Sequence, residues 1–197
     1  GIKWTRLQAE IFRFLCIKSG MVLNLRGIAR LLHRRSPTAV SKALVDLEKA
    51  GLVRVEKSKI MNLSSIELNR DNPKTIYLKR VENLKMIYES GLVDFLFEEF
   101  PGCPIVLFGS YSKGEDTTYS NQDVYVGGEH ETDIDMAIIG SKEKHIKLTK
   151  FDKQLERTIF LHFFDNLKNI KENLRNSIIN GIVLKGNIEL WENLRNF

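Results

Sequence analysis

The sequence predicts an α/β protein of the α+β kind, in which a basic helical domain precedes a mixed sheet with flanking helices. Apolar residues make up 43% of the 197 positions, which is typical of a globular protein with a real core. Helical periodicity and a hairpin pattern occupy the first part, whereas short buried-strand patterns appear in the second. We place a first domain with a connecting helix at residues 1–88 and a second domain with a helical tail at residues 89–197.

Charge is distributed unevenly along the chain. Residues 1–60 contain thirteen Lys and Arg against four Asp and Glu, whereas residues 101–140 contain one Lys against seven acidic residues. This segregation predicts two surfaces with different partners. The apolar runs are too short for a membrane span, so we expect a cytoplasmic protein without membrane association. Cys16 and Cys103 are too few for a disulfide framework or a zinc site and are predicted to be free, buried thiols.

The first part of the chain contains three short helical patterns. Residues 4–19 carry apolar side chains at helical spacing. A second helix is expected after Asn24, which has a side chain suited to an N-cap. The third helix has the clearest boundaries, because Ser36 is a natural N-cap and Pro37 fits the first helical position. Gly51 marks its end.

Residues 52–69 alternate like two strands joined by a polar tip. Three helices followed by a hairpin resemble a winged helix-turn-helix, over roughly residues 4–80. In that family the third helix enters the DNA major groove and the wing contacts the backbone. The resemblance implies binding of double-stranded DNA by residues at the start of the third helix and at the tip of the hairpin: Arg34, Arg35, Ser36, Thr38, Ser41, Lys42, Lys57 and Lys59. A winged helix used only for protein contacts or dimerisation is the alternative.

A long connecting helix is expected to open at Pro73 and to end at Gly91, with a short apolar helix before Pro101. The run "PIVLF" then reads as a buried strand that ends at a Gly109-Ser110 turn, and a helical turn follows. A strand–glycine–helix junction directs free backbone N–H groups at one point, which suits an anion.

The run "TDIDMAIIG" places Asp133 and Asp135 on one face of a further strand. Two carboxylates so close repel each other unless a cation lies between them. Mg²⁺, which accepts carboxylate and phosphate oxygens, fits such a pair. A triphosphate on the turn and its metal on the carboxylates is an arrangement suited to nucleotidyl transfer.

"LFGSYSKGE" followed by "TDIDMAIIG" resembles the minimal nucleotidyltransferase domain of the DNA polymerase β superfamily, over roughly residues 92–165. Combined with a winged helix, it is similar to a group of archaeal proteins described as nucleotidyltransferase-like. The resemblance implies that Gly109 and Ser110, with Lys113 nearby, hold the nucleotide phosphates. It also implies that Asp133 and Asp135 are catalytic metal ligands for Mg²⁺, with an NTP as substrate.

Two features depart from that family. Ser110 and Asp133 are 23 positions apart, a longer spacing than the family's, and residues 116–131 look like an inserted hairpin. Within it, "SNQD" imitates the acidic motif with Asn121 in the place of the first acid, but we favour Asp133 and Asp135 because an unbroken apolar strand follows them.

The second departure is the third carboxylate, which the family takes from a following strand. That strand is expected at residues 157–164, and the acid position aligns best with Phe160. His162 is the next residue on the same face and is a candidate catalytic base. A purely structural histidine is the alternative, and neither Glu156 nor Asp165 is as well placed.

These observations lead to two hypotheses. The first is an enzyme that transfers an NMP from an NTP to a nucleic acid, a protein or a small molecule. The alternative is a DNA-binding transcriptional regulator, or an antitoxin-like protein, whose degenerate transferase domain only binds nucleotide. A protein partner and a homodimer remain open.

Overall fold

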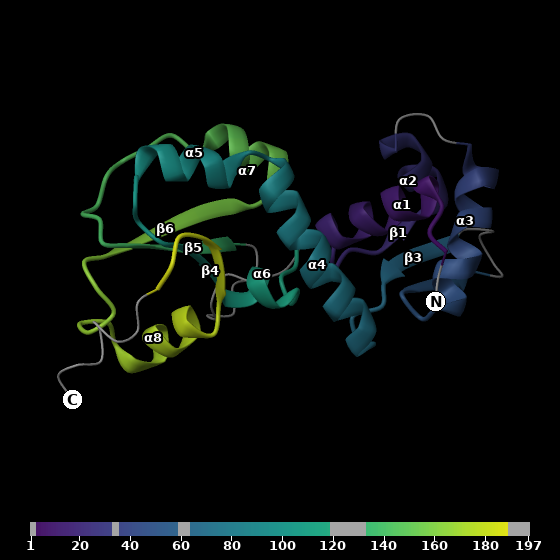
Figure 1. Ribbon diagram of the computed structural model, residues 1–197. Helices are drawn as coiled ribbons and strands as arrows, with labels where there is room; N and C mark the ends of the chain where they lie inside the picture. Colours follow the sequence, from purple (N-terminus) through teal and green to yellow (C-terminus); the bar gives the residue numbers. More distant parts are fainter. Residues whose placement is uncertain (1–2, 33–35, 59–63, 119–132, 189–197) are drawn as a thin grey trace. The chain divides into compact units, whose positions relative to one another are not determined.

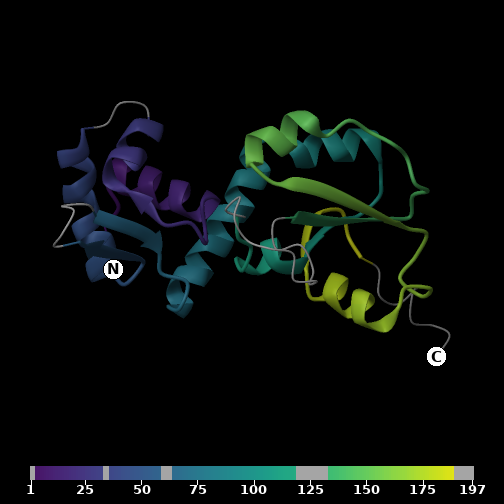
Figure 2. The same cartoon turned by 180° about the vertical axis from the view of Figure 1, so that it is seen from behind.

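The computed structural model describes residues 3–32, 36–58, 64–118 and 133–188 (Figures 1 and 2). By contacts, the described residues divide into two compact units. The first contains residues 3–82 with 117–118, and the second contains residues 83–116 and 133–188. The division falls inside the helix α4, Pro73–Glu89. The structure is of mixed α and β composition, as the sequence predicts.

The first unit has the element order of a winged helix. The second and third helices begin where the sequence indicates, and the first begins at Arg6, two residues later than expected. Asn24 and Ser36 cap their helices through side chains that accept from the N–H groups of Gly27 and Ala39. Thr5 forms a reciprocal capping box with Gln8. The elements are α1 (Arg6–Ile17), β1 (Leu23–Asn24), α2 (Leu25–Leu31), α3 (Pro37–Lys49), β2 (Val53–Lys57) and β3 (Ser64–Leu68).

The hairpin strands β2 and β3 pair antiparallel, and the short β1 pairs with the other side of β3. One face of this small sheet packs with the three helices around a single hydrophobic core. That core includes Ile11, Ile28, Leu47 and Ile66, which are fully buried. Burial of these apolar stripes holds α3 in place, so its other face is left for solvent.

The second unit is built on a four-stranded sheet in the order β6-β5-β4-β7. Strand β5 runs antiparallel to β4 and parallel to β6, and β7 is antiparallel to β4. Figures 1 and 2 show α5 and α7 on one face of this sheet and α8 on the other. The elements are α5 (Leu92–Glu99), β4 (Ile105–Phe108), α6 (Gly109–Lys113), β5 (Asp133–Ile139), α7 (Thr149–Leu155), β6 (Thr158–Phe164), α8 (Glu172–Ile179) and β7 (Ile182–Lys185).

Three elements of this fold lie outside the sequence prediction: β1, α7 and β7. Residues 182–185 lie in the part expected to be a helical tail, but they form β7 and pair with β4 instead. Cys16 is buried, as expected, whereas Cys103, in the turn that leads into β4, is only partly buried. Within the described ranges, no helix combines the length and apolar character that a bilayer crossing requires.

Candidate functional site

The junction between β4 and α6 brings the chain close to Asp135. Gly109 has φ +78°, and a Cβ atom added to it would lie 2.9 Å from Asp135 Oδ2. The neighbouring Phe108 is the register partner of Asp135 across the antiparallel pair. Both the backbone conformation and the available space therefore require glycine at position 109.

Asp133 and Asp135 lie on one face of β5, as their spacing predicts, and both are half-buried. The residues between and after them, Ile134 and Met136, are fully buried on the opposite face. The strand thus has an apolar side anchored in the core, which fixes the direction of the two carboxylates.

His162 lies next to Asp135. Its Nε2 atom is 2.9 Å from Asp135 Oδ1, a hydrogen bond whose donor depends on the tautomer of the ring. The imidazole also meets the ring of Phe108 edge-on, at 5.2 Å between centroids. The side chains of His162 and Asp135 remain 36% and 29% exposed, so the pair is held in place and still accessible.

The residue that faces Asp135 across the parallel β5–β6 pair is Phe160. This is the position that the nucleotidyltransferase resemblance assigns to a third carboxylate. The phenyl ring is 47% exposed, and it offers no oxygen to a metal or a proton. His162, one step further along the same face, faces Ala137 in the register and reaches back to Asp135.

The remaining predicted phosphate contacts lie on α6, which is a single helical turn. Ser110 is half-buried at its start, and Lys113 is exposed at its end. Ser112, which the sequence analysis did not single out, donates from Oγ to the carbonyl of Gly109 at 2.6 Å and so stabilises the turn. The structure thus brings Gly109, Asp135 and His162 together, with Ser110 following directly.

A buried polar network stabilises the end of this turn, and the sequence analysis did not identify it. The guanidinium of Arg157 donates to Asp116 Oδ2 from Nη2 at 2.9 Å and from Nε at 3.2 Å. Asn83 on α4 donates to Asp116 Oδ1 at 2.7 Å and to the carbonyl of Tyr111 at 3.0 Å. Since Asp116 and the Arg157 side chain are 0% and 2% exposed, this network joins α4, the end of the glycine–serine turn and the start of β6.

The two aspartates satisfy the minimal requirement for a magnesium ion. Mg²⁺ in nucleotide sites takes one or two carboxylates and completes its shell with phosphates and water. Asp133 and Asp135 supply two carboxylates on one partly exposed face. Across the described ranges there is no group of three or more His, Cys, Asp and Glu that could hold a metal. The residues present would therefore hold Mg²⁺ only together with phosphate oxygens.

The candidate DNA-binding residues lie at the start of α3 and the end of β2. Ser36 caps α3 and is exposed, and the first turn of the helix contains no acidic residue. Thr38, Ser41 and Lys42 on α3 and Lys57 at the end of β2 are exposed as well. Arg34, Arg35 and Lys59 lie outside the described residues, as does most of the predicted insertion at 116–131.

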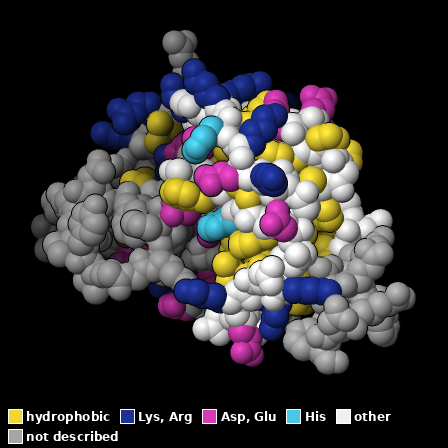
Figure 3. Space-filling view, turned by 90° about the vertical axis from the view of Figure 1, so that its left-hand side faces the viewer, with side chains coloured by type: hydrophobic (Ala, Val, Ile, Leu, Met, Phe, Trp, Pro, Cys, Tyr) yellow, Lys and Arg dark blue, Asp and Glu magenta, His cyan; other side chains and the backbone are white. Residues whose placement is uncertain are grey.

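The surface of the molecule differs between regions. In the space-filling view of Figure 3, acidic, basic and hydrophobic side chains are interspersed on the visible face. Such a mixture contrasts with the start of α3, where the exposed polar residues are hydroxyls and a lysine.

No family model matches the chain, and no curated protein matches it. Among solved structures, the chain is similar to ZitR, a zinc-responsive MarR family member from Lactococcus lactis, at 23% identity and a TM-score of 0.39. The match covers 51% of this chain and 65% of ZitR, just under two thirds of that protein.

Proposed function

We propose that this protein is a DNA-binding regulator. Its second unit binds a nucleoside triphosphate together with Mg²⁺ but does not transfer the NMP group to an acceptor. The observation that carries the proposal is Phe160, because a side chain without oxygen occupies the position facing Asp135. Nucleotide binding needs the phosphate turn and the carboxylate pair, whereas transfer by the mechanism that the resemblance implies also needs a third acid. Among the described residues the groups for binding are present, and a phenyl ring stands at the position of the third acid.

The DNA-binding half of the proposal is supported by α3. Its exposed hydroxyls and Lys42 lie near a helix N-terminus, where backbone N–H groups and the helix dipole favour phosphate. The sequence immediately before this helix adds Arg34 and Arg35. These residue types bind duplex DNA mainly through its backbone, so the interaction should depend strongly on salt.

The nucleotide-binding half is supported by the close approach of Gly109 to Asp135. Because residue 109 has no side chain, the turn can approach Asp135 closely, so phosphates bound by the backbone N–H groups of the turn would lie beside the carboxylates. Asp133 and Asp135 would hold Mg²⁺, which supplies the positive charge that the phosphates and carboxylates share. The buried Asp116–Arg157 pair keeps the end of the turn in position.

A nucleotidyltransferase is the second candidate, and the His162–Asp135 contact favours it. A neutral imidazole at this place accepts a proton from an attacking hydroxyl in the way that a third acid does in the family. The 2.9 Å contact with Asp135 would orient the ring and stabilise the imidazolium that forms.

One assay separates the two functions. The protein is incubated with labelled ATP, CTP, GTP and UTP in the presence of Mg²⁺, and label is sought on the protein, on co-purifying partners and on nucleic acid. The regulator proposal predicts metal-dependent retention of nucleotide without covalent transfer. Transfer that is lost in both Asp135→Ala and His162→Ala would establish the enzyme instead.

DNA binding is tested separately by titration of a fluorescent duplex over a salt series. We expect affinity to fall steeply as salt rises, and the Arg34→Ala/Arg35→Ala variant to bind more weakly with a shallower slope. Equal binding by wild type and variant at every salt concentration would exclude this surface.

A further inference from the structure

Strand β6 forms one edge of the four-stranded sheet. In the described part of the chain, β5 is the strand that pairs with it. The N–H of Gly140, just after β5, donates to the carbonyl of Phe164 at 2.7 Å. Because successive residues of a strand direct their backbone groups to opposite edges, Leu161 and Phe163 direct theirs to the outer edge. The N–H of Ile159 on this edge donates to Asp152 Oδ1 at 3.0 Å.

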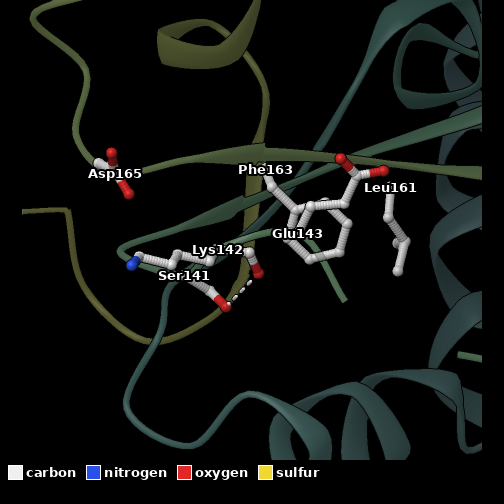
Figure 4. Close-up of a pocket in the computed structure, with 6 residues that line it drawn as sticks. All are labelled: Ser141, Lys142, Glu143, Leu161, Phe163 and Asp165. Atoms are coloured by element: carbon white, nitrogen blue, oxygen red, sulfur yellow. Dashed lines mark hydrogen bonds between the residues drawn. The ribbon is translucent and has the colours of Figure 1, made fainter. Parts of the chain in front are cut away.

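A cavity of about 420 Å³ opens beside this edge (Figure 4). Leu161 and Phe163 form its apolar part, and the segment that follows β5 forms the polar part. Its lining residues are Ser141, Lys142, Glu143, Leu161, Phe163 and Asp165. The cavity therefore lies on the face of the sheet opposite to His162, since odd and even residues of β6 point to different faces.

The other face of the same edge also exposes apolar surface, because Phe160 is 47% exposed. Backbone groups at the edge, a cavity on one face and a phenyl ring on the other thus adjoin one another along β6. A helix or a small molecule would cover one of these faces. An added strand covers both, because its side chains alternate between the two faces.

We propose that a second copy of this chain supplies that strand, so that β6 pairs antiparallel with its own counterpart across a two-fold axis. The seven residues of β6, TIFLHFF, contain no charge, proline or glycine. Natural sheet edges are usually protected from pairing by lysine, proline or a bulge, and β6 has no such residue. The contact of Asp152 with the N–H of Ile159 protects only the first part of the strand. Self-pairing places no like charges opposite each other, and β6 carries apolar side chains for both faces.

The length of the strand selects the register. Full overlap of Thr158–Phe164 with its counterpart puts Leu161 on the two-fold axis. Leu161 then exchanges N–H and C=O bonds with Leu161 of the second copy, through the groups that point to the outer edge. Because the N–H of Ile159 remains bound to Asp152, the pair on each side joins through the N–H of Phe163 and the carbonyl of Ile159. On the other face, Phe160 lies opposite His162 of the second copy, which forms an aromatic cross-strand pair beside the candidate nucleotide site. This inference is independent of the proposed function.

A cysteine at the two-fold axis tests the register. In an antiparallel hydrogen-bonded pair the Cα atoms are about 5.5 Å apart, which is within disulfide range. In a Cys103→Ser background, we expect Leu161→Cys to give a disulfide-linked dimer on mild oxidation. Thr158→Cys is the control. In this register Thr158 faces Phe164 of the second copy, so the two Thr158 residues are six positions apart along the strands, or about 20 Å. Absence of the dimer for Leu161→Cys, or equal cross-linking of both variants, would overturn the proposal.

Light scattering on the uncross-linked protein tests the interface itself. We expect a wild-type dimer and a Phe160→Lys monomer at the same concentration, since two lysines would be desolvated at the pairing edge. The matched control is Val183→Lys, which changes a 42% exposed residue of β7 at the opposite edge of the sheet, and it should remain dimeric. A wild-type monomer, or a dimer that persists in Phe160→Lys, would contradict the proposal.

Discussion

The two candidate sites of this protein are built in opposite ways. The groups around Asp135 in the second unit are partly buried and hydrogen-bonded, and they are supported by the enclosed Asp116–Arg157 pair. The candidate DNA-binding residues of α3 are exposed side chains on a helix whose other face supplies the core. A site for a metal–nucleotide needs fixed distances, whereas a surface for a polyanion needs accessible charge. We therefore expect substitutions in the second unit to weaken nucleotide binding by displacing the groups of the site. Substitutions in the first unit should weaken DNA binding by removing positive charge.

The largest effect is expected from the buried ion pair. Arg157→Ala leaves Asp116 as an uncompensated buried charge, which costs about 3–5 kcal/mol. Hydrogen exchange of the β5 and β6 amides should therefore accelerate strongly. Lys85→Ala, which removes an exposed ion pair with Glu89, is the control and should change exchange little. Similar exchange in both variants would show that the network does not stabilise the site.

The next effect concerns the close approach at Gly109. Gly109→Ala imposes a left-handed conformation on alanine, at about 1–2 kcal/mol, and pushes a methyl group against Asp135. Gly102→Ala is a matched control, because Gly102 has the same φ of +78° and nothing within 4 Å of the added Cβ. We expect Gly102→Ala to show the backbone cost alone, and Gly109→Ala to be destabilised further and to bind nucleotide more weakly. If both variants bind nucleotide as wild type does, the phosphate position is wrong.

A smaller effect is expected at the DNA-binding surface. Lys42→Ala removes one exposed positive charge near the start of α3, so the slope of log affinity against log salt should become shallower by about 1. Lys49→Ala removes another exposed lysine, from the last turn of the same helix, and should leave the slope unchanged. A change of slope in both variants would show a diffuse attraction in place of a defined surface.

The smallest effect is expected from an exposed ion pair whose two residues are not candidates for either site. Arg54 holds the pKa of Asp71 below its usual value, through a hydrogen bond and charge attraction. The pair therefore contributes stability above the unfolded pKa of the carboxyl, and this contribution is lost as pH falls through the lower folded pKa. The difference in urea midpoint between wild type and Asp71→Asn should be small at neutral pH and vanish in acid. A constant difference would exclude the pair as its origin.

The sequence predicted local features more completely than distant ones. Asn24 and Ser36 act as N-caps because their partners lie three residues away, and the face of Asp133 and Asp135 follows from strand alternation. Strand β7 depends on its pairing with β4, which no local pattern encodes. The Asp116–Arg157 pair joins residues 41 positions apart, although each adjoins a predicted element. Composition and periodicity describe neighbouring residues, so they do not predict which distant segments pair.

The measurement that tests the central claim most directly is calorimetry of NTP binding, with and without Mg²⁺, to wild type and to Asp133→Ala/Asp135→Ala. The account predicts metal-dependent binding by the wild type that is lost in the double variant, because the two carboxylates share the cation with the phosphates. Circular dichroism would verify that the variant remains folded. Equal metal-dependent affinity in the two proteins would contradict the assignment of this site.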